Sequence, residues 1–382
     1  MKVGVPKEIK PQEYRVGLTP GAVREYLAAG HEVVVETNAG AGIGADDAAY
    51  LKAGAQIAPG AAQVFADAEM IVKVKEPQPQ EWQRLSEGQI LFTYLHLAPD
   101  PRQTEGLMKS GCTAVAYETV TDARGSLPLL APMSEVAGRL SIEAAGMALK
   151  SSNGGRGLLL GGVPGVQPAK VVVIGGGVVG THAARMAAGL GAEVTILDRS
   201  LPRLRELDDL FMSRIKTRFS SIESIEEEVF SADVVIGAVL VPGASAPKLV
   251  TRDMLKEMKR GAVVVDVAID QGGCFETSHA TTHADPTYVV DGIIHYCVAN
   301  MPGSVPLTSS HALNNATLPF GLALADKGLR ALLDDPHLRA GLNVHRGEIT
   351  HPAVAKSLGL PLKDAVEAVQ EDLRRHGARL AS

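Results

Sequence analysis

Cysteine is scarce in this chain of 382 residues, which contains three cysteines. Cys112, Cys274 and Cys297 are far apart and never form a CxxC pair, so the sequence predicts neither a disulfide framework nor a zinc site. An odd number of dispersed thiols suits a reducing compartment, and we expect a cytoplasmic protein.

Long apolar runs and an excess of positive charge are also missing. No apolar segment approaches the roughly 18 residues that a membrane span needs, and MKVGVPKEIK leads straight into a strand pattern. The net charge is −6, from 37 basic and 43 acidic residues, so nothing attracts phosphate backbones or acidic membranes. We expect a soluble, unprocessed chain whose partners include neither nucleic acid nor membrane.

The composition is typical of an α/β enzyme. Hydrophobic residues make up 46% of the chain and aromatic residues 4%, and there are 40 glycines. Glycine is abundant where strands and helices are joined by tight turns. Since single domains usually have about 100 to 200 residues, two domains are expected.

Short apolar runs alternate with helical patterns in both halves of the chain. KVGVP, HEVVVET, MIVKVKE, ILFTYLH and CTAVAYET form one series, and KVVVIGGG, EVTILD, residues 214–218, DVVIGAVL, AVVVDVAID and YVVDGIIHYCVAN form another. Such alternation predicts βαβ units in two parallel sheets. A helix over 132–150, with Pro132 near its start, precedes a Gly- and Pro-rich loop between the two series.

The tail from about residue 305 has a helical pattern throughout. We expect it to cover the first sheet, which makes the first domain discontinuous. The predicted architecture is therefore two Rossmann-like, doubly wound α/β domains with a cleft between them. Residues 1–128 and 305–382 form the first domain, and residues 129–304 form the second.

The segment VVVIGGGVVG carries the strongest local motif. Gly175, Gly177 and Gly180 satisfy GxGxxG between a buried strand and a helix of small residues, which is the pattern of a dinucleotide-binding loop. Asp198 ends EVTILD about 20 residues beyond the glycines, where a carboxylate binds ribose hydroxyls and repels a 2′-phosphate. This favours NAD over NADP; the alternative is a surface turn with an N-capping aspartate.

Other polar residues follow predicted strands, where a parallel sheet presents its ligand crevice. Asp266 and Asp270 end AVVVDVAID, and Asp270, before a glycine turn, is the better placed to face a cofactor, although it could simply cap the turn. His96 ends ILFTYLH and is either a packed core residue or a proton-transfer group.

Three cations in the first series could bind an acidic substrate. Lys73 and Lys75 share one face of the MIVKVKE strand, where a lysine can hold a carboxylate or polarise a carbonyl, or can be a solvated edge charge. Arg15 lies in a loop before a helix that Thr19 caps, and it could bind a carboxylate through two donors or lie on the surface.

The segment HATTH places His279 and His283 at the spacing of two helical metal ligands. It lacks the glutamate of HExxH and lies among Thr and Pro residues, so we do not expect a metal site.

Nine motifs together resemble the alanine dehydrogenases over nearly the whole chain: MKVGVPKEIK, YRVGLTPGAV, KVKEP, LHLAPD, PMSEVAGRLS, IGGGVVG, VIGAVLVPG, DVAIDQGG and VANMPGSVP. The resemblance implies an NAD-dependent L-alanine dehydrogenase, with substrate bound by the first domain and NAD by the second. It also implies a homohexamer.

Site residues follow from the same resemblance. It implies substrate binding by Arg15 and Lys75, and catalysis by His96 and Asp270. The implied cofactor contacts, besides the glycine loop and Asp198, are Ser134, Val178, Arg203, Ser220, Val239, Leu240, Val267, Ala268, Ile269, Asp270, Val298, Ala299, Asn300 and Met301.

Three alternatives remain at this stage. The alpha subunit of a proton-translocating nicotinamide nucleotide transhydrogenase shares the two-domain plan, but its membrane segment is not seen here, and it needs no pocket for a small acid. A saccharopine-type or other opine dehydrogenase would need a larger pocket. A silent NAD-binding regulator would not need the catalytic groups.

Overall fold

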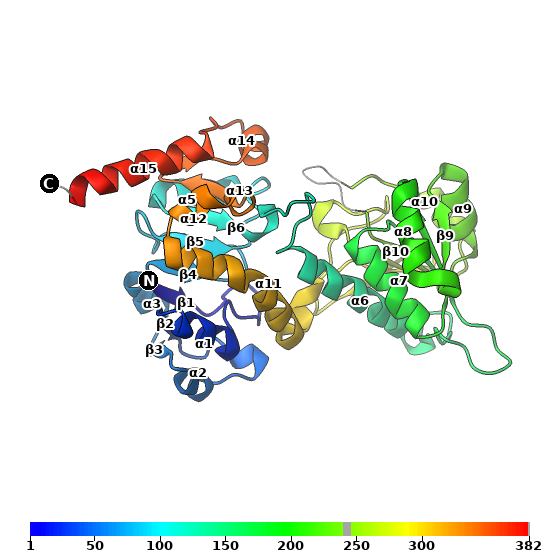
Figure 1. Cartoon of the computed structure of the whole chain (residues 1–382). Coiled ribbons are helices and arrows are strands. Elements are labelled where there is room, and N and C mark those ends of the chain that lie inside the picture. Colours follow the sequence, from blue (N-terminus) through cyan, green and yellow to red (C-terminus); the bar gives the residue numbers. More distant parts are fainter. Residues whose placement is uncertain (240–245, 381–382) are drawn as a thin grey trace. The chain divides into compact units, whose positions relative to one another are not determined.

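The computed structural model describes residues 1–239 and 246–380 (Figure 1). The chain forms two compact units: residues 1–132 with 305–382, and residues 133–304. Each unit is built on one mostly parallel sheet, which confirms the predicted α/β class with two domains. In the part of the chain that the structure describes, no helix is both long and apolar enough to cross a membrane.

The first unit contains an eight-stranded sheet with the strand order β15-β14-β6-β5-β4-β1-β2-β3. Its strands are β1 (Lys2–Val5), β2 (Glu32–Glu36), β3 (Gln56–Ala58), β4 (Met70–Val72), β5 (Ile90–Thr93), β6 (Thr113–Ala116), β14 (Leu342–His345) and β15 (Glu348–Ile349). Strands β1 to β6 are parallel. The chain leaves β1 toward β2 and returns to β4 on the other side, so the strand order reverses at β1.

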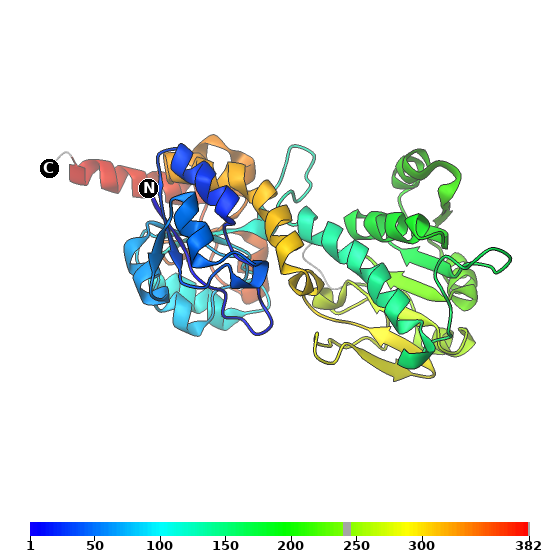
Figure 2. The same ribbon diagram turned by 90° about the horizontal axis from the view of Figure 1, so that it is seen from below.

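Helices from both ends of the chain surround this sheet. They are α1 (Pro20–Ala28), α2 (Asp47–Ala53), α3 (Ala61–Asp67), α4 (Pro79–Trp82), α5 (Pro101–Ser110), α11 (Pro306–Lys327), α12 (Arg330–Asp334), α13 (Pro336–Arg339), α14 (Pro352–Leu358) and α15 (Ala365–Leu380). Helix α11 packs beside α1 (Figures 1 and 2). Thr19 caps α1 as predicted, because its Oγ1 accepts a hydrogen bond from the Ala22 amide at 3.3 Å.

The second unit contains a seven-stranded sheet with the order β12-β13-β11-β10-β7-β8-β9. Its strands are β7 (Lys170–Ile174), β8 (Glu193–Asp198), β9 (Lys216–Phe219), β10 (Val234–Gly237), β11 (Val263–Asp266), β12 (Thr287–Val290) and β13 (Ile293–Tyr296). The order reverses between β7 and β10, as in doubly wound dinucleotide-binding folds.

Both faces of the second sheet are covered by helices: α6 (Ala131–Ala148), α7 (Val178–Gly189), α8 (Leu201–Phe211), α9 (Ile222–Ser231) and α10 (Arg252–Glu257). On one face, alternate strand residues such as Val171 and Val173 pack with α6 and α7. On the other, Val172 and Ile174 pack with α9 and α10. This explains the continuous apolar runs of the parallel strands, because both of their faces are buried.

Two hairpins correct the sequence-based topology. The segment YVVDGIIHY forms the antiparallel strands β12 and β13, joined by Asp291 and Gly292, both at positive φ. This is the Asp-Gly turn favoured in two-residue hairpins. The tail was expected to be entirely helical, but it also contains a hairpin. In this hairpin β14 pairs antiparallel with β15, and Arg346 and Gly347, both at positive φ, join the two strands. Strand β14 also pairs antiparallel with β6.

Candidate active site

The glycine loop lies between β7 and α7, and its geometry requires glycine at Gly175 and Gly180. Gly175 has φ +107°, and a Cβ there would lie 2.6 Å from the Ala238 carbonyl oxygen. A Cβ on Gly180 would lie 1.8 Å from the Gly175 carbonyl oxygen. Gly177, the N-cap of α7, has nothing within 4 Å of its Cβ direction. The loop therefore leaves open space at a helix N-terminus, where main-chain N–H groups attract phosphate.

Asp198, the last residue of β8, is held against this loop. Its Oδ2 accepts a hydrogen bond from the Gly176 amide at 2.7 Å, and its Oδ1 accepts one from the Ser200 amide at 2.8 Å. Arg203 also contacts the loop, donating from Nε to the Gly176 carbonyl at 2.7 Å and from Nη2 to Thr181 Oγ1 at 2.8 Å. Arg203 is thus tied to the loop by two hydrogen bonds.

The other predicted cofactor residues mostly follow carboxyl ends of strands in this sheet. Ser220 follows β9, Val239 follows β10, Val267–Asp270 follow β11, and Val298–Met301 lie between β13 and α11. Ile269, Val298 and Met301 are buried, so they can meet a ligand mainly through their main chain. Ser134 lies in the first turn of α6, and Leu240 lies outside the described residues.

Asp266 and Asp270 have different environments. Asp266 is fully buried, and its Oδ2 accepts hydrogen bonds from Ser278 Oγ at 2.5 Å and the Cys274 amide at 2.8 Å. Burial raises the pKa of the Asp266 carboxyl, although these donors oppose the rise. Asp270 is exposed in the 3-10 turn Ile269–Gln271. Asp266 therefore anchors the following loop, and Asp270 is the one accessible to a ligand.

In the first unit, the prediction that Lys73 and Lys75 share a strand is wrong, because β4 ends at Val72. Lys73 is fully buried between two carboxylates, with its Nζ 3.1 Å from Glu8 Oε2 and 2.8 Å from Glu81 Oε1. Burial acts to lower the pKa of Lys73, but the two carboxylates outweigh it and raise the pKa. Lys73 is therefore a structural cation.

Lys75 lies two residues further along, with 13% of its side chain exposed. Its Nζ is 3.8 Å from Glu76 Oε2, and its carbonyl oxygen accepts a hydrogen bond from Thr93 Oγ1 at 3.0 Å. The latter bond fixes the Lys75 main chain to the end of β5, the strand that leads to His96.

Arg15 is buried rather than on the surface, with 2% of its side chain exposed. Its Nε donates to Glu13 Oε1 at 2.7 Å and its Nη2 donates to Glu13 Oε2 at 2.6 Å, which is a bidentate ion pair. Burial acts to lower the pKa of Arg15, but the hydrogen bonds and charge of Glu13 raise it. Glu13 thus keeps a charged guanidinium in a fixed orientation.

His96 lies three residues beyond the end of β5, with 43% of its side chain exposed. It is not a packed core residue. Its φ is +50°, and its ring stacks on Tyr94 with ring centroids 5.8 Å apart. Tyr94 interacts electrostatically with Arg15. The structure therefore places an exposed imidazole beyond the carboxyl end of β5, and Lys75 lies beyond the carboxyl end of the neighbouring strand β4.

Three carboxylates near these residues were not predicted from the sequence: Glu8, Glu13 and Glu118. Glu8 accepts a hydrogen bond from the Val74 amide at 2.7 Å, and Glu118 accepts one from the His96 amide at 2.6 Å. Burial raises the pKa of the Glu8 carboxyl. Glu8 and Glu118 follow β1 and β6, so the signal was available: both are acids just beyond a parallel strand.

The two histidines of HATTH are engaged separately. His279 stacks on Tyr288 with ring centroids 3.7 Å apart, and His283 Nε2 is 3.2 Å from the Asn300 carbonyl oxygen. Among the described residues, no group of three or more His, Cys, Asp or Glu side chains is arranged to hold a metal ion.

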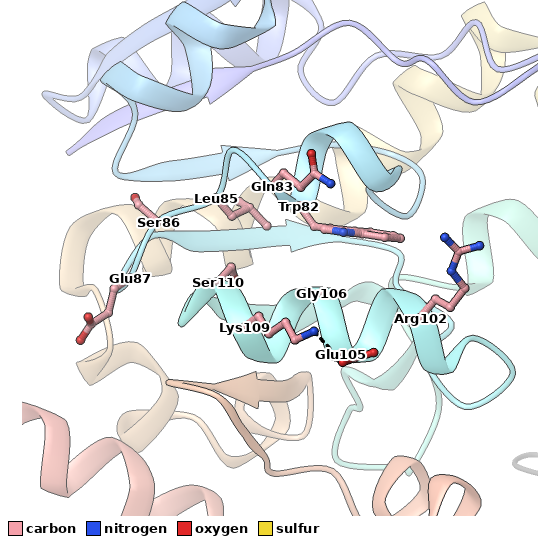
Figure 3. Close-up of a pocket in the computed structure, with 10 residues that line it drawn as sticks. All are labelled: Trp82, Gln83, Leu85, Ser86, Glu87, Arg102, Glu105, Gly106, Lys109 and Ser110. Carbon is pink, nitrogen blue, oxygen red and sulfur yellow. Dashed lines mark ion pairs between the residues drawn. The ribbon is translucent and has the colours of Figure 1, made fainter.

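A surface hollow of about 610 Å³ lies between α4 and α5 of the first unit (Figure 3). Trp82 and Leu85 contribute its apolar part, while Arg102, Glu105 and Lys109 contribute charge. Glu105 and Lys109 pair with each other at 2.6 Å. None of the predicted site residues lines this hollow.

The fold of the second unit, its glycine loop and Asp198 define a dinucleotide-binding α/β enzyme class. Two family models identify the family within this class. The model "Alanine dehydrogenase/PNT, N-terminal domain" matches residues 4–137, and the model "Alanine dehydrogenase/PNT, C-terminal domain" matches residues 141–352. The chain belongs to the alanine dehydrogenase/PNT family.

Individual relatives agree with this family. An alanine dehydrogenase of Halomonas elongata is 60% identical over 370 residues, covering 97% of this chain and all of the relative. One of Bacillus subtilis is 54% identical over 380 residues, covering 99% and 100%. A solved L-alanine dehydrogenase aligns with a TM-score of 0.92 at 54% identity, covering 94% and 99%. A transhydrogenase from Sinorhizobium meliloti aligns with 0.78 at 27% identity, covering 92% and 100%.

Proposed function

We propose that this protein is an NAD-dependent L-alanine dehydrogenase. It interconverts L-alanine, NAD⁺ and water with pyruvate, ammonium, NADH and a proton. The observation that carries the proposal is near-full-length identity of 54 to 60% to proteins named alanine dehydrogenase. The resemblance to a transhydrogenase is much weaker in sequence.

The second unit has residues that fit NAD. Open space at Gly177 suits a pyrophosphate, and the Asp198 carboxylate beside the loop suits ribose hydroxyls and disfavours a 2′-phosphate. The main chains of Val267–Asp270 and Val298–Met301, with Ser134, Val178, Arg203, Ser220, Val239 and Leu240, complete the proposed contacts. With NAD held by these residues, the nicotinamide would supply the acceptor for the hydride from the substrate C2 in one direction and its donor in the other.

Arg15 and Lys75 are the proposed substrate-binding residues. The guanidinium of Arg15 is charged and is held by Glu13. A second cation at Lys75 allows the carboxylate and the carbonyl oxygen of pyruvate to be bound together. This two-point binding restricts the rotation of pyruvate, which aligns its C2 for hydride transfer.

His96 is the proposed acid and base for the steps at C2. During alanine formation, ammonia adds to C2 of pyruvate, and the carbinolamine loses water to give an iminium ion that receives the hydride. An exposed imidazole can supply and remove the protons because histidine changes charge near neutral pH. Asp270, an exposed carboxylate, stabilises the cationic iminium or shares the proton transfers.

The experiment is a spectrophotometric assay of NADH formation from NAD⁺ with and without L-alanine. We expect alanine-dependent reduction, and NADH oxidation that requires both pyruvate and ammonium. Hydride exchange between two nucleotides without an amino acid would instead support a transhydrogenase subunit. Activity with lysine and 2-oxoglutarate, but not alanine, would support a saccharopine-type enzyme, and no turnover at all would support a regulator.

We also propose a cytoplasmic homohexamer. Cys112, Cys274 and Cys297 are free and buried, which suits a reducing compartment. Six chains of 40.0 kDa predict a particle of about 240 kDa in light scattering. A scattering mass near that of one or two chains would contradict the assembly.

A further inference from the structure

Glu118 lies beside the proposed active site, but the mechanism above gives it no role. It lies in the 3-10 turn Tyr117–Thr119, directly after β6, and β6 is the parallel neighbour of β5. Its side chain is 13% exposed. Its Oε1 accepts a hydrogen bond from the His96 amide at 2.6 Å, and its Oε2 accepts one from the Leu95 amide at 3.1 Å.

These two bonds act on a main chain that is under strain. His96 has φ +50°, in the left-handed region that residues other than glycine rarely adopt. Such conformations cost on the order of 1–3 kcal/mol and persist where surrounding interactions hold them. The carboxylate of Glu118 holds consecutive amides on either side of Leu95, so it opposes relaxation of this turn.

The same carboxylate faces the imidazole. His96 Nδ1 lies 4.0 Å from Glu118 Oε1, and the ring stacks on Tyr94 with an interplanar angle of 7°. At 4.0 Å the contact is electrostatic and too long for a hydrogen bond. The carboxylate attracts the positive charge that the ring carries while it holds a proton taken from the substrate.

We propose that Glu118 is a positioning residue for His96: it holds the strained main chain, and its charge stabilises the imidazolium that forms during turnover. This inference rests on the proposed function of His96 as the acid and base. Glu118 acts through His96 and does not touch the substrate.

The other ionisable groups around this pair are few among the described residues. Tyr94 is buried, and burial raises its pKa, so it stays neutral. Arg15 acts on Tyr94 electrostatically. His351, at the N-cap of α14, interacts with Glu118, and burial lowers the pKa of His351, so it is neutral near pH 7. Among the described ion pairs, the one that involves His96 is with Glu118.

The test compares Glu118→Gln with Asp122→Asn in the full-length protein. The glutamine side chain would keep an oxygen that accepts main-chain hydrogen bonds but would lose the charge. Asp122 is a matched control, because its Oδ1 accepts hydrogen bonds from the amides of Arg124 at 2.9 Å and Ser126 at 2.8 Å in the loop that follows. Both changes remove a carboxylate that braces a turn, and only one of these turns carries His96.

We expect Glu118→Gln to lower kcat for alanine oxidation about tenfold or more, since charge-assisted hydrogen bonds are roughly twice as strong as neutral ones. The KM for L-alanine and the Kd for NADH should stay within about threefold. Glu118→Asp should recover part of kcat.

A wild-type kcat in Glu118→Gln would overturn the inference while leaving the proposed function intact. An equal loss in Asp122→Asn would also overturn it, because the effect would then come from general loosening of the fold. A wild-type protein without alanine-dependent turnover would overturn the proposed function, and this inference with it.

Discussion

Replacement of Gly180 by alanine should separate the structural and ligand-binding roles of the glycine loop. The added Cβ would lie 1.8 Å from the Gly175 carbonyl oxygen and 3.2 Å from Val173 Cγ1. A main-chain oxygen that close must move, since real Cβ atoms essentially never come within 3.0 Å of another heavy atom. Such overpacking typically costs about 1–3 kcal/mol. The helix preference of alanine over glycine returns up to about 1 kcal/mol.

The contact at 1.8 Å puts the cost at the upper end of this range, so we expect Gly180→Ala to lower the free energy of unfolding by about 2 kcal/mol, measured by urea denaturation with circular dichroism. Gly189→Ala, at the last residue of the same helix, is the matched control, because no atom lies within 4 Å of its Cβ direction. That change should leave stability unchanged or raise it slightly.

Gly177→Ala probes the open side of the loop. Since no atom lies within 4 Å of its Cβ direction and its φ is −68°, the fold should tolerate alanine. The Cβ would instead enter the space proposed for the pyrophosphate. We therefore expect the Kd for NADH, measured by fluorescence titration, to rise about tenfold or more, which is a loss of about 1.4 kcal/mol of binding free energy. Tight NADH binding by Gly177→Ala would contradict the proposed pyrophosphate site, and full stability of Gly180→Ala would contradict the close contact of Gly180 with Gly175.

Lys73 and His295 are buried ionisable groups whose effect on stability can be measured. Lys73→Met should lower the free energy of unfolding by about 3–5 kcal/mol, because Glu8 and Glu81 would lose their shared cation; a Tm equal to that of the wild type would contradict this role. His295 is fully buried, and burial lowers its pKa below 6.5, so the folded state favours the neutral ring. Its contribution to stability is therefore present above about pH 6.5 and is lost as the pH falls through the lowered folded pKa. Urea denaturation from about pH 8 to about pH 5 should show this loss, and His295→Asn should reduce the slope; an unchanged slope would contradict it.

Local patterns were sufficient to predict most of the fold. Period, length and flanking glycines identified the parallel strands, because strands buried on both faces are continuous apolar runs. The tail hairpin was missed because LNVHRGEI is short and follows a long helical segment. Asp291-Gly292 is a hairpin signal in the sequence, but the prediction treated the whole segment YVVDGIIHYCVAN as one parallel strand, whereas β12 and β13 are antiparallel.

The candidate site residues at the ends of strands could be predicted from the sequence, but the residues that pair with them could not. His96 and Asp198 could be proposed from the sequence because each stands at or just beyond the carboxyl end of a parallel strand, where such sheets bind ligands. The ion pair of Lys73 with Glu8 spans 65 residues, and that proximity depends on the neighbouring positions of β1 and β4. Spacing alone could not tell that Lys73 is buried while Lys75 is partly exposed.

The His96→Ala variant, measured for turnover and for NADH affinity in parallel, tests most directly whether His96 is the acid and base of an alanine dehydrogenase. We expect alanine-dependent NAD⁺ reduction to be lost, while the Kd for NADH stays within about twofold of wild type, because the proposed cofactor residues lie in the second unit. Near-normal turnover in His96→Ala would contradict the proposed role of His96.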